Sequence, residues 1–356
     1  MSGAGSPLVR LAKTLSVRWD ALAAAEHDSN RRLEQLQRSL NARAVDSEER
    51  SVVAFGSLAR GEWTQGSDLD WTLLIDGQAN ADHLIIAQEV RSAVETGFKG
   101  PGATGLFGSM AFSHDIIHRI GGEYDTNRNT SQRILLLLES KTIGSKTEAY
   151  DRVVSGVLDR YLREEANLLE RWADGQKVPR FLLNDVVRFW RTMAVDFASK
   201  QRERAGEGWG IRNIKLRMSR KLIFVAGLFM CFSCRLARSE RVKSAGTEQD
   251  LISSLVEQLR EYVRMTPLEI VADAVLRYGV DEGVARQLFR AYDEFIQMLA
   301  NTEKRKELEG LRAENALGSD VFKAARNTSY QFQDALSKIF FDNETVGPLT
   351  RMYGVF

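Results

Sequence analysis

The sequence has little cysteine, almost no net charge and no long apolar run, and each shortage excludes a class of protein. Its 356 residues include two cysteines, Cys231 and Cys234. Two cysteines cannot build a disulfide scaffold or supply the four ligands of a structural zinc site. Both lie in an apolar run, so we expect buried thiols and a reducing, cytoplasmic location. The net charge of +1 gives no bulk attraction to nucleic acid or membrane, so any basic surface must be local.

The longest apolar run is LIFVAGLFMCFSC, at 222–234, with 13 residues. A membrane-spanning helix needs about 20 apolar residues, so this run predicts a buried helix instead. The first residues, MSGAGSPLVRLAKTLSVRWD, lack the apolar centre of a secretory signal. We therefore expect no association with a membrane.

The chain is long enough for about two domains. At 1–50, leucines recur at steps of three and four, which predicts a leading helical segment. At 51–148, apolar strand-like and helix-like stretches alternate, and from 149 to 356 helical periodicity dominates without strand alternation. The expected fold is α+β, with a small mixed-sheet domain at 51–148 packed on a larger all-helical domain at 149–356.

Within 51–148, SVVAF and DLDWTLLI predict strands at 51–55 and 68–75. A helix is expected at about 79–96, and four glycines and a proline at 97–105 predict a loop. The following stretch, LFGSMAFSHDIIHRI, is interpreted as one extended segment at 106–120. The apolar SQRILLLLES after it is compatible with a helix.

The stretch FGSLARGEWTQGSDLDWTLLID, at 55–76, has the pattern of a catalytic site. On a strand, Asp68 and Asp70 point to the same face, because side chains alternate with period two. Two adjacent carboxylates repel each other unless a cation lies between them. Carboxylate oxygens suit Mg²⁺ or Mn²⁺, and two such ions are the usual arrangement for phosphoryl-type transfer.

The residues before the aspartates have the pattern of a phosphate site. Gly56 allows a sharp turn and a close approach of the backbone to a ligand, and successive N–H groups in such a turn bind anions. The Ser57 hydroxyl adds a hydrogen bond, and Arg60 adds a positive charge. One triphosphate with bound metal could therefore contact both ends of this stretch.

Taken together, Phe55-Gly56-Ser57 followed by Asp68-Leu69-Asp70-Trp71 resembles the polymerase-β-like nucleotidyltransferase superfamily. The form GSxARGExxxxSDxD, which includes Ser67, and the later segment TSQRILLLLESKTIGS are similar to the branch with the bacterial PII uridylyltransferases. The resemblance implies that Asp68 and Asp70 are catalytic metal ligands and that Gly56, Ser57, Arg60 and Ser67 bind nucleotide. It also implies a third carboxylate on a later strand, for which Asp115 is the candidate and Asp125 the alternative.

A basic segment in the helical part offers a second contact for nucleotide. Residues 200–243 hold twelve Lys or Arg and three Glu. The superfamily commonly uses such residues to neutralise the triphosphate, which makes Lys215, and then Arg212, the candidates. The segment is equally compatible with the phosphate backbone of RNA or DNA, or with an ordinary solvated face.

The resemblance implies a bacterial, cytoplasmic enzyme that uses ATP or another nucleoside triphosphate (NTP). It would transfer a nucleoside monophosphate (NMP) to an acceptor hydroxyl and release pyrophosphate. The acceptor is open: a protein side chain, an RNA or DNA 3′ end, or a second nucleotide. The last would make a cGAS-like cyclic oligonucleotide synthase of antiphage defence. An inactive nucleotide-binding module is a further alternative. Only four histidines occur, so the metal hydrolase that reverses uridylylation in full-length PII uridylyltransferases is not expected.

Overall fold

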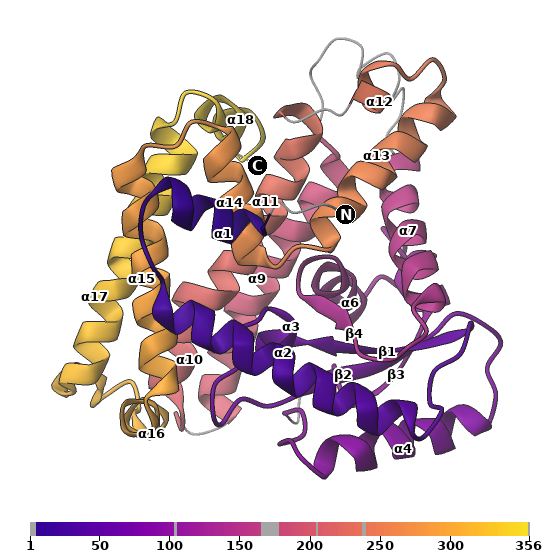
Figure 1. Ribbon diagram of the computed structural model, residues 1–356, viewed down its shortest axis with the longest axis horizontal. Helices are drawn as coiled ribbons and strands as arrows, with labels where there is room; N and C mark the ends of the chain where they lie inside the picture. The colour runs from indigo at the N-terminus through magenta and orange to yellow at the C-terminus, as the bar shows by residue number, and fades with distance from the viewer. Residues whose placement is uncertain (1–4, 103–104, 165–177, 204–205, 237–239, 355–356) are drawn as a thin grey trace. The chain divides into compact units, whose positions relative to one another are not determined.

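The computed structural model describes residues 5–102, 105–164, 178–203, 206–236 and 240–354. Most of these residues are helical, and a four-stranded mixed sheet lies in the first half of the chain (Figure 1). This confirms the expectation of a small mixed-sheet domain together with a larger helical part. Both cysteines are buried, as expected, and burial raises the pKa of the Cys231 thiol well above its ordinary value.

The first half of the chain contains both helices and strands. They are α1 (Pro7–Thr14), α2 (Asp20–Asn41), β1 (Arg50–Phe55), α3 (Gly56–Ala59), β2 (Asp70–Ile75), α4 (Asp82–Glu95), β3 (Ser109–Phe112), α5 (Ser113–Ile117), α6 (Asn127–Leu138), β4 (Ser140–Thr142) and α7 (Glu148–Arg163). The expected strands at 51–55 and 68–75 and the helix at 79–96 correspond to β1, β2 and α4. The extended segment expected at 106–120 is wrong beyond residue 112, where the chain turns into α5.

The elements described after residue 178 are all helical. They are α9 (Arg180–Glu203), α10 (Trp209–Lys215), the π-helix η1 (Leu216–Arg220), α11 (Lys221–Leu236), α12 (Glu240–Lys243), α13 (Glu248–Val263), α14 (Pro267–Arg277), α15 (Glu282–Ala300), α16 (Thr302–Gly310), the short 3₁₀-helix η2 (Ala316–Gly318), α17 (Asp320–Ser337), the π-helix η3 (Lys338–Asp342) and α18 (Val346–Tyr353). The apolar run at 222–234 lies within α11, as predicted. Among the described residues, no helix combines the length and apolar content that crossing a bilayer requires.

The chain forms two compact units that are interleaved along the sequence. Unit 1 comprises 1–25, 190–229 and 267–356, and unit 2 comprises 26–189 and 230–266. The sequence pattern instead predicts three consecutive segments, at 1–50, 51–148 and 149–356. The difference arises because α2, α9 and α11 each contain a boundary between the units, which a change of periodicity along the sequence does not reveal.

The sheet of unit 2 has the strand order β3-β2-β1-β4. β1 pairs antiparallel with β2, with Phe55 opposite Asp70, and antiparallel with β4, with Phe55 opposite Ser140. β2 and β3 are parallel, with Thr72 opposite Ser109. The end of β1 and the beginnings of β2, β3 and β4 therefore lie at the same end of the sheet, which we call the carboxylate end.

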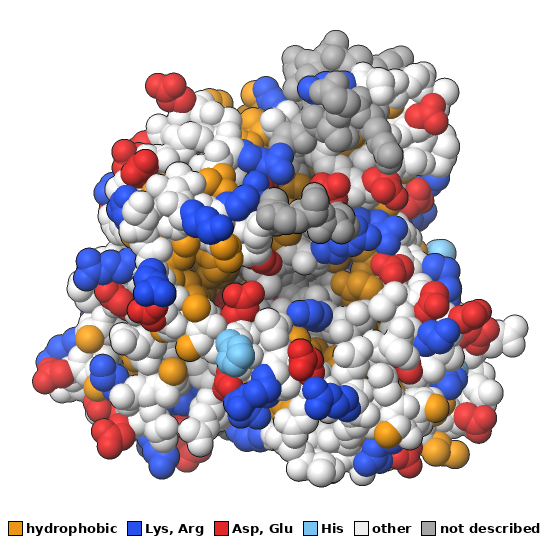
Figure 2. Space-filling view, in the orientation of Figure 1, with side chains coloured by type: hydrophobic (Ala, Val, Ile, Leu, Met, Phe, Trp, Pro, Cys, Tyr) orange, Lys and Arg blue, Asp and Glu red, His pale blue; other side chains and the backbone are white. Residues whose placement is uncertain are grey.

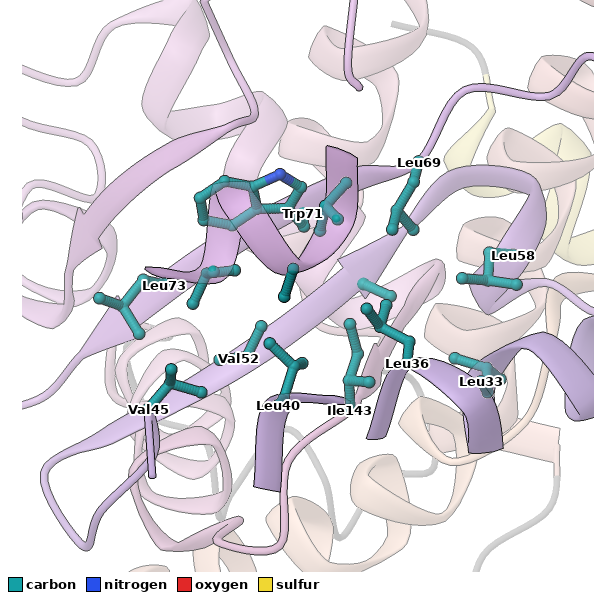
Figure 3. Close-up of a cluster of buried hydrophobic side chains, with 14 of the residues drawn as sticks. Leu33, Leu36, Leu40, Val45, Val52, Leu58, Leu69, Trp71, Leu73 and Ile143 are labelled. Atoms are coloured by element: carbon teal, nitrogen blue, oxygen red, sulfur yellow. The ribbon is translucent and has the colours of Figure 1, made fainter. Parts of the chain in front are cut away.

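One face of the sheet packs on α2 and α4 and forms the main core of this region. Leu33, Leu36 and Leu40 of α2 point toward the strands, where Val52 and Trp71 lie (Figure 3). Each of these five side chains is less than one-tenth exposed. Burial of a leucine side chain contributes roughly 1.5–3 kcal/mol, so this leucine stripe holds α2 on the sheet.

The opposite face of the sheet, which carries Asp70, Thr72 and Leu74 by alternation, faces α5 and α6. An apolar cavity on this face is lined by residues of both helices and of three strands: Val53, Phe55, Thr72, Leu74, Ala111, Ile116, Gln132 and Leu136. Layers of helix therefore cover both faces of the sheet.

A buried ion network joins α6, α7 and α9 within unit 2. Arg133 is fully buried and pairs with both oxygens of Asp125, at 2.9 and 2.8 Å, and with Asp185 at 2.9 Å. The Tyr161 hydroxyl donates to Asp185 at 2.6 Å, and Arg188 adds a contact to Asp125 at 3.2 Å. Burial alone would lower the pKa of Arg133, but these partners raise it above its ordinary value. The network therefore keeps Arg133 charged inside the protein.

The core of unit 1 is aromatic. Phe289, Tyr292 and Phe295 of α15 and Phe322 and Phe332 of α17 are almost completely buried. Trp19 stacks on Phe289, with ring centroids 5.0 Å apart. Asp281 and Ser319 cap the amino ends of α15 and α17, where their side chains accept backbone N–H bonds. On the molecular face drawn in Figure 2, acidic and basic side chains are interspersed, in keeping with the net charge of +1.

Candidate active site

The carboxylate end of the sheet brings together the turn at Gly56 and the aspartate pair. Phe55 ends β1 directly before Gly56, and it is the register partner of Asp70, the first residue of β2. Asp68 precedes β2 by two residues and forms a bridge to Lys99. Both carboxylates are partly exposed. The antiparallel pairing of β1 and β2 thus places two motifs that are eleven residues apart in sequence side by side.

Gly56 lies directly against the Asp70 carboxylate. Its φ is +71°, a left-handed conformation that residues with a Cβ rarely adopt. A methyl group on Gly56 would lie 3.0 Å from Asp70 Oδ2. Glycine is therefore required here both by the backbone conformation and by the nearby carboxylate. Ser57, the next residue, is partly exposed. Its backbone carbonyl accepts a hydrogen bond from the Glu62 N–H at 2.8 Å.

Lys99, from the glycine-rich loop before β3, contacts the first aspartate. Its ammonium lies 2.8 Å from Asp68 Oδ1, and its carbonyl accepts the Leu69 N–H at 2.8 Å. Sequence reasoning missed this residue. The signal that could have found it is a lone cation in a glycine-rich loop between two strands.

Arg60, which is predicted to contact phosphate, forms ion pairs with two glutamates. Its side chain is 10% exposed, with Nε 2.8 Å from Glu62 and Nη1 hydrogen-bonded to Glu139. Both glutamates are more buried than the arginine. A guanidinium that turned to a phosphate would give up its ion pairs with both of these buried carboxylates. Arg60 therefore holds the turn at Gly56 next to the start of β4 through its ion pair with Glu139.

Ser67, also predicted to bind nucleotide, closes the loop before the aspartates. It is buried, and its hydroxyl lies 3.3 Å from both the N–H and the hydroxyl of Thr64. The role that these contacts assign to Ser67 is to shape residues 64–67. The predicted nucleotide contact of Ser67 stays a prediction.

Asp115, the candidate third carboxylate, lies at the opposite end of the sheet from Asp70. It is in α5, three residues after the end of β3 at Phe112, and Phe112 is the partner of Ile75 at the far end of β2. Asp70 and Ile75 are about 16 Å apart along the strand at ~3.3 Å per residue. The Asp115 carboxylate pairs with Arg119 at 2.9 Å. An extended continuation of β3 would carry Asp115 still further from the pair, because β2 and β3 run parallel.

The alternative third ligand, Asp125, belongs to the buried network. Its two oxygens are bound by Arg133, and one of them also receives the Gly121 N–H at 3.2 Å. At the β3 position that continues the register to Asp70, the chain has Phe107, whose ring packs on Phe55 with centroids 4.9 Å apart. Among the described residues, no group of three or more His, Cys, Asp or Glu side chains has the geometry of a metal site.

The two basic candidates of the helical part lie in α10, which belongs to unit 1. The Arg212 guanidinium donates to the carbonyls of Lys200, Glu207 and Gly208. Arg212 therefore holds the local backbone, and its predicted contact with triphosphate stays a prediction. Lys215 is the last residue of α10 and is partly buried. Its predicted contact with triphosphate stays a prediction.

The oxygen atoms of Asp68 and Asp70 fit a divalent cation chemically. A cationic group already lies against Asp68, and Gly56 leaves room beside Asp70 that a side chain would fill. Hard cations such as Mg²⁺ bind through one or two carboxylates completed by substrate phosphates and water. Two carboxylates without a third protein ligand are sufficient for that mode.

A family model described as nucleotidyltransferase domain matches residues 33–96. The match includes the second half of α2, the turn at Gly56, both aspartates and α4. Searches of curated proteins and of solved structures found no significant match. With the geometry above, the match supports assigning residues 33–96 to a nucleotidyltransferase domain of the polymerase-β-like superfamily.

Proposed function

We propose that this protein is a metal-dependent nucleotidyltransferase that moves an NMP from an NTP to an acceptor hydroxyl. The observation that carries the proposal is the contact between Gly56 and Asp70, where a methyl group would come within 3.0 Å of the carboxylate. This contact places a turn of the kind that binds phosphate beside two carboxylates of the kind that bind metal ions, Asp68 and Asp70. A strand edge with two solvated aspartates would not need a glycine with positive φ beside it.

In the proposed reaction the acceptor oxygen attacks the α-phosphorus of the NTP. A new O–P bond forms, the bond between the α-phosphorus and the bridging oxygen breaks, and pyrophosphate leaves. The acceptor proton passes to solvent. Catalysis of this kind consists mostly of positioning and of neutralising charge on the phosphates.

Each residue of the carboxylate end has a part in this proposal. Asp68 and Asp70 would hold Mg²⁺ or Mn²⁺, and when bound these ions would neutralise phosphate charge and orient the acceptor oxygen. The Ser57 hydroxyl and the backbone at Gly56 would bind phosphate oxygens. Arg60, through Glu62 and Glu139, would keep the turn in place for this contact.

We also propose that the domain belongs to the branch that contains the PII uridylyltransferases. The resemblance to that branch rests on two separate segments, GSLARGE and LLLLESK. The ion triad of Arg60, Glu62 and Glu139 connects one segment to the other. A physical link between the two segments is a reason for both to occur together in one sequence.

A nucleotide-binding module without transfer activity is the second candidate. It is favoured by one observation, the position of Phe107 where the superfamily resemblance implies a third carboxylate. Such a module would bind NTP with divalent cation but would not release pyrophosphate. The same experiment separates the two candidates.

The test is incubation of the purified protein with each α-labelled NTP and Mg²⁺ or Mn²⁺, with pyrophosphate release measured in parallel. Label on protein, on RNA or DNA, or on a cyclic small product identifies the acceptor. NTP binding by calorimetry without label or pyrophosphate in any mixture would favour the module. Absence of NTP binding would contradict both candidates.

Replacement of Gly56 by alanine is expected to weaken NTP binding with divalent cation by at least tenfold. The new Cβ strains a backbone with φ of +71°, at a cost of roughly 1–2 kcal/mol. It also displaces the Asp70 carboxylate, from which it would be only 3.0 Å away. Isothermal titration calorimetry with NTP and Ca²⁺ measures the affinity.

Gly61→Ala is the matched control, because Gly61 has nearly the same φ, +72°, in the same loop. Its nearest neighbour is the Glu26 side chain at 3.7 Å, an ordinary contact. We expect a similar loss of stability from Gly61→Ala but little change in affinity. Equal effects of the two substitutions on affinity would mean that backbone strain alone, and not the contact with Asp70, is responsible.

A further inference from the structure

Lys99 is held by its backbone at the carboxylate end while its side chain stays in solvent. Its carbonyl accepts the Leu69 N–H at 2.8 Å, and its Cα is the bridge partner of Asp68. The lysine side chain is 73% exposed, and the Asp68 side chain is 37% exposed. The position of the residue is therefore set by the sheet, whereas its ammonium can exchange partners.

The ammonium of Lys99 lies against one of the two oxygens through which Asp68 could bind a cation. It is 2.8 Å from Oδ1 of that carboxylate. The Lys99 side chain is mostly exposed, so solvent screening weakens the pair, although the Asp68 Oδ1 atom itself is buried. A divalent cation that brings phosphate oxygens with it can therefore displace the ammonium from Asp68.

A displaced Lys99 would find a new partner at the same end of the sheet. Lysine is a compact point charge on a four-carbon stem and is a common ligand of phosphate. Phosphates bound at Gly56 and Ser57 would lie beside Asp70, two residues from the partner that Lys99 leaves. Arg60 is bound in its own buried triad, so it does not supply this charge.

We propose that Lys99 is a substrate-positioning residue that binds Asp68 in the absence of nucleotide and binds the triphosphate in its presence. This inference rests on the proposed function and adds a residue to it. In the unliganded protein, Lys99 competes with divalent cation for Asp68. With nucleotide, it contributes a positive charge to the phosphates. Because Lys99 would leave Asp68 when nucleotide binds, the affinity of Asp68 for a divalent cation would depend on nucleotide.

The test uses Lys99→Met in the full-length protein and two separate measurements. The first is Mn²⁺ binding without nucleotide, followed by the electron paramagnetic resonance of free Mn²⁺. Loss of the competing ammonium is expected to tighten Mn²⁺ binding about two- to fivefold, the size of an exposed ion pair. The second is NTP binding with Ca²⁺ by calorimetry, which is expected to weaken by about tenfold and to be largely restored in Lys99→Arg.

Lys146→Met is the matched control. Lys146 is also exposed and lies in unit 2, but its carbonyl bonds to Ser51, at the other end of β1 from Gly56. Mn²⁺ and NTP affinities of this variant are expected to equal those of the wild type. An effect as large as that of Lys99→Met would show that any loss of positive charge is enough, and would overturn the inference.

The outcomes separate the inference from the proposed function. A wild-type protein that binds no NTP contradicts the proposed function, and the phosphate role of Lys99 with it. A wild-type protein that binds NTP, with Lys99→Met unchanged in NTP affinity, contradicts the role of Lys99 alone. Unchanged or weaker Mn²⁺ binding in Lys99→Met overturns the competition for Asp68 in either case.

Discussion

Asp70→Asn is expected to reduce nucleotide transfer by about 10³-fold. The substitution keeps the shape of the side chain but removes the negative charge that would hold the metal. A loss of several kcal/mol of metal-derived stabilisation, about 4 kcal/mol, corresponds to this factor. Pyrophosphate release with each NTP measures the effect. Because Asp70 is partly exposed at the start of β2, the variant is expected to fold normally.

Asp115→Asn is the control that the sheet register provides. It is expected to retain transfer within about twofold, since Asp115 follows β3 at the end of the sheet that lies away from Asp70. Loss of transfer in Asp115→Asn as large as in Asp70→Asn would contradict this register and restore Asp115 as the third ligand. Full transfer in Asp70→Asn would contradict the proposed chemistry.

Arg133→Met is expected to cause the largest loss of stability among the substitutions considered, about 3–5 kcal/mol. Removal of one member of a buried ion network leaves its partners charged and without compensation. Here two buried carboxylates, Asp125 and Asp185, would lose the guanidinium they share. Thermal unfolding followed by circular dichroism is expected to show a decrease in Tm of roughly 6–20 °C.

Arg119→Met is a suitable comparison, because its ion pair with Asp115 is about two-fifths exposed on both sides. Such pairs contribute at most about 1 kcal/mol, so its Tm is expected to stay within a few degrees of the wild type. If Arg133→Met does not fold, Arg133→Lys, which keeps the charge but loses the bidentate contact to Asp125, gives the graded measurement. A Tm for Arg133→Lys equal to that of the wild type would show that the bidentate contact with Asp125 does not stabilise the protein.

The sequence contains enough information to predict the local backbone around Gly56 and the two aspartates. Alternation on a strand places Asp68 and Asp70 on one face, and a glycine followed by serine at a strand end marks the turn. Both follow from local backbone geometry, which depends on neighbouring residues only. The small mixed sheet and the larger helical part were predictable for the same reason, because periodicity distinguishes strand from helix over short windows.

The position of Asp115, the candidate third carboxylate, could not be predicted, because it depends on strand direction. The stretch around Asp115 has apolar and polar residues that suit either a strand or a short helix. The parallel pairing of β2 and β3, which follows from the intervening α4, decides at which end of the sheet the chain leaves. Neither the pairing nor the turn into α5 is a property of residues 106–120 alone.

The partners of the charged residues were also out of reach of sequence reasoning. Arg60 lies two residues from Glu62 but 79 residues from Glu139, and both contacts are needed to assign its role. Asp125 and Arg133 are eight residues apart and meet because a helix begins between them. Which charges are buried together depends on tertiary packing, so a motif identifies a charge without identifying its partner.

The triad around Arg60 has a consequence for how small an independently folding version of the domain can be. The segment that matches the family, residues 33–96, ends before β3 and β4 and does not contain Glu139. A protein cut at residue 96 would expose both edges of the β1–β2 pair and leave Arg60 and Glu62 without the second carboxylate. A fragment that keeps the whole sheet must therefore extend at least to residue 142, where the last strand ends.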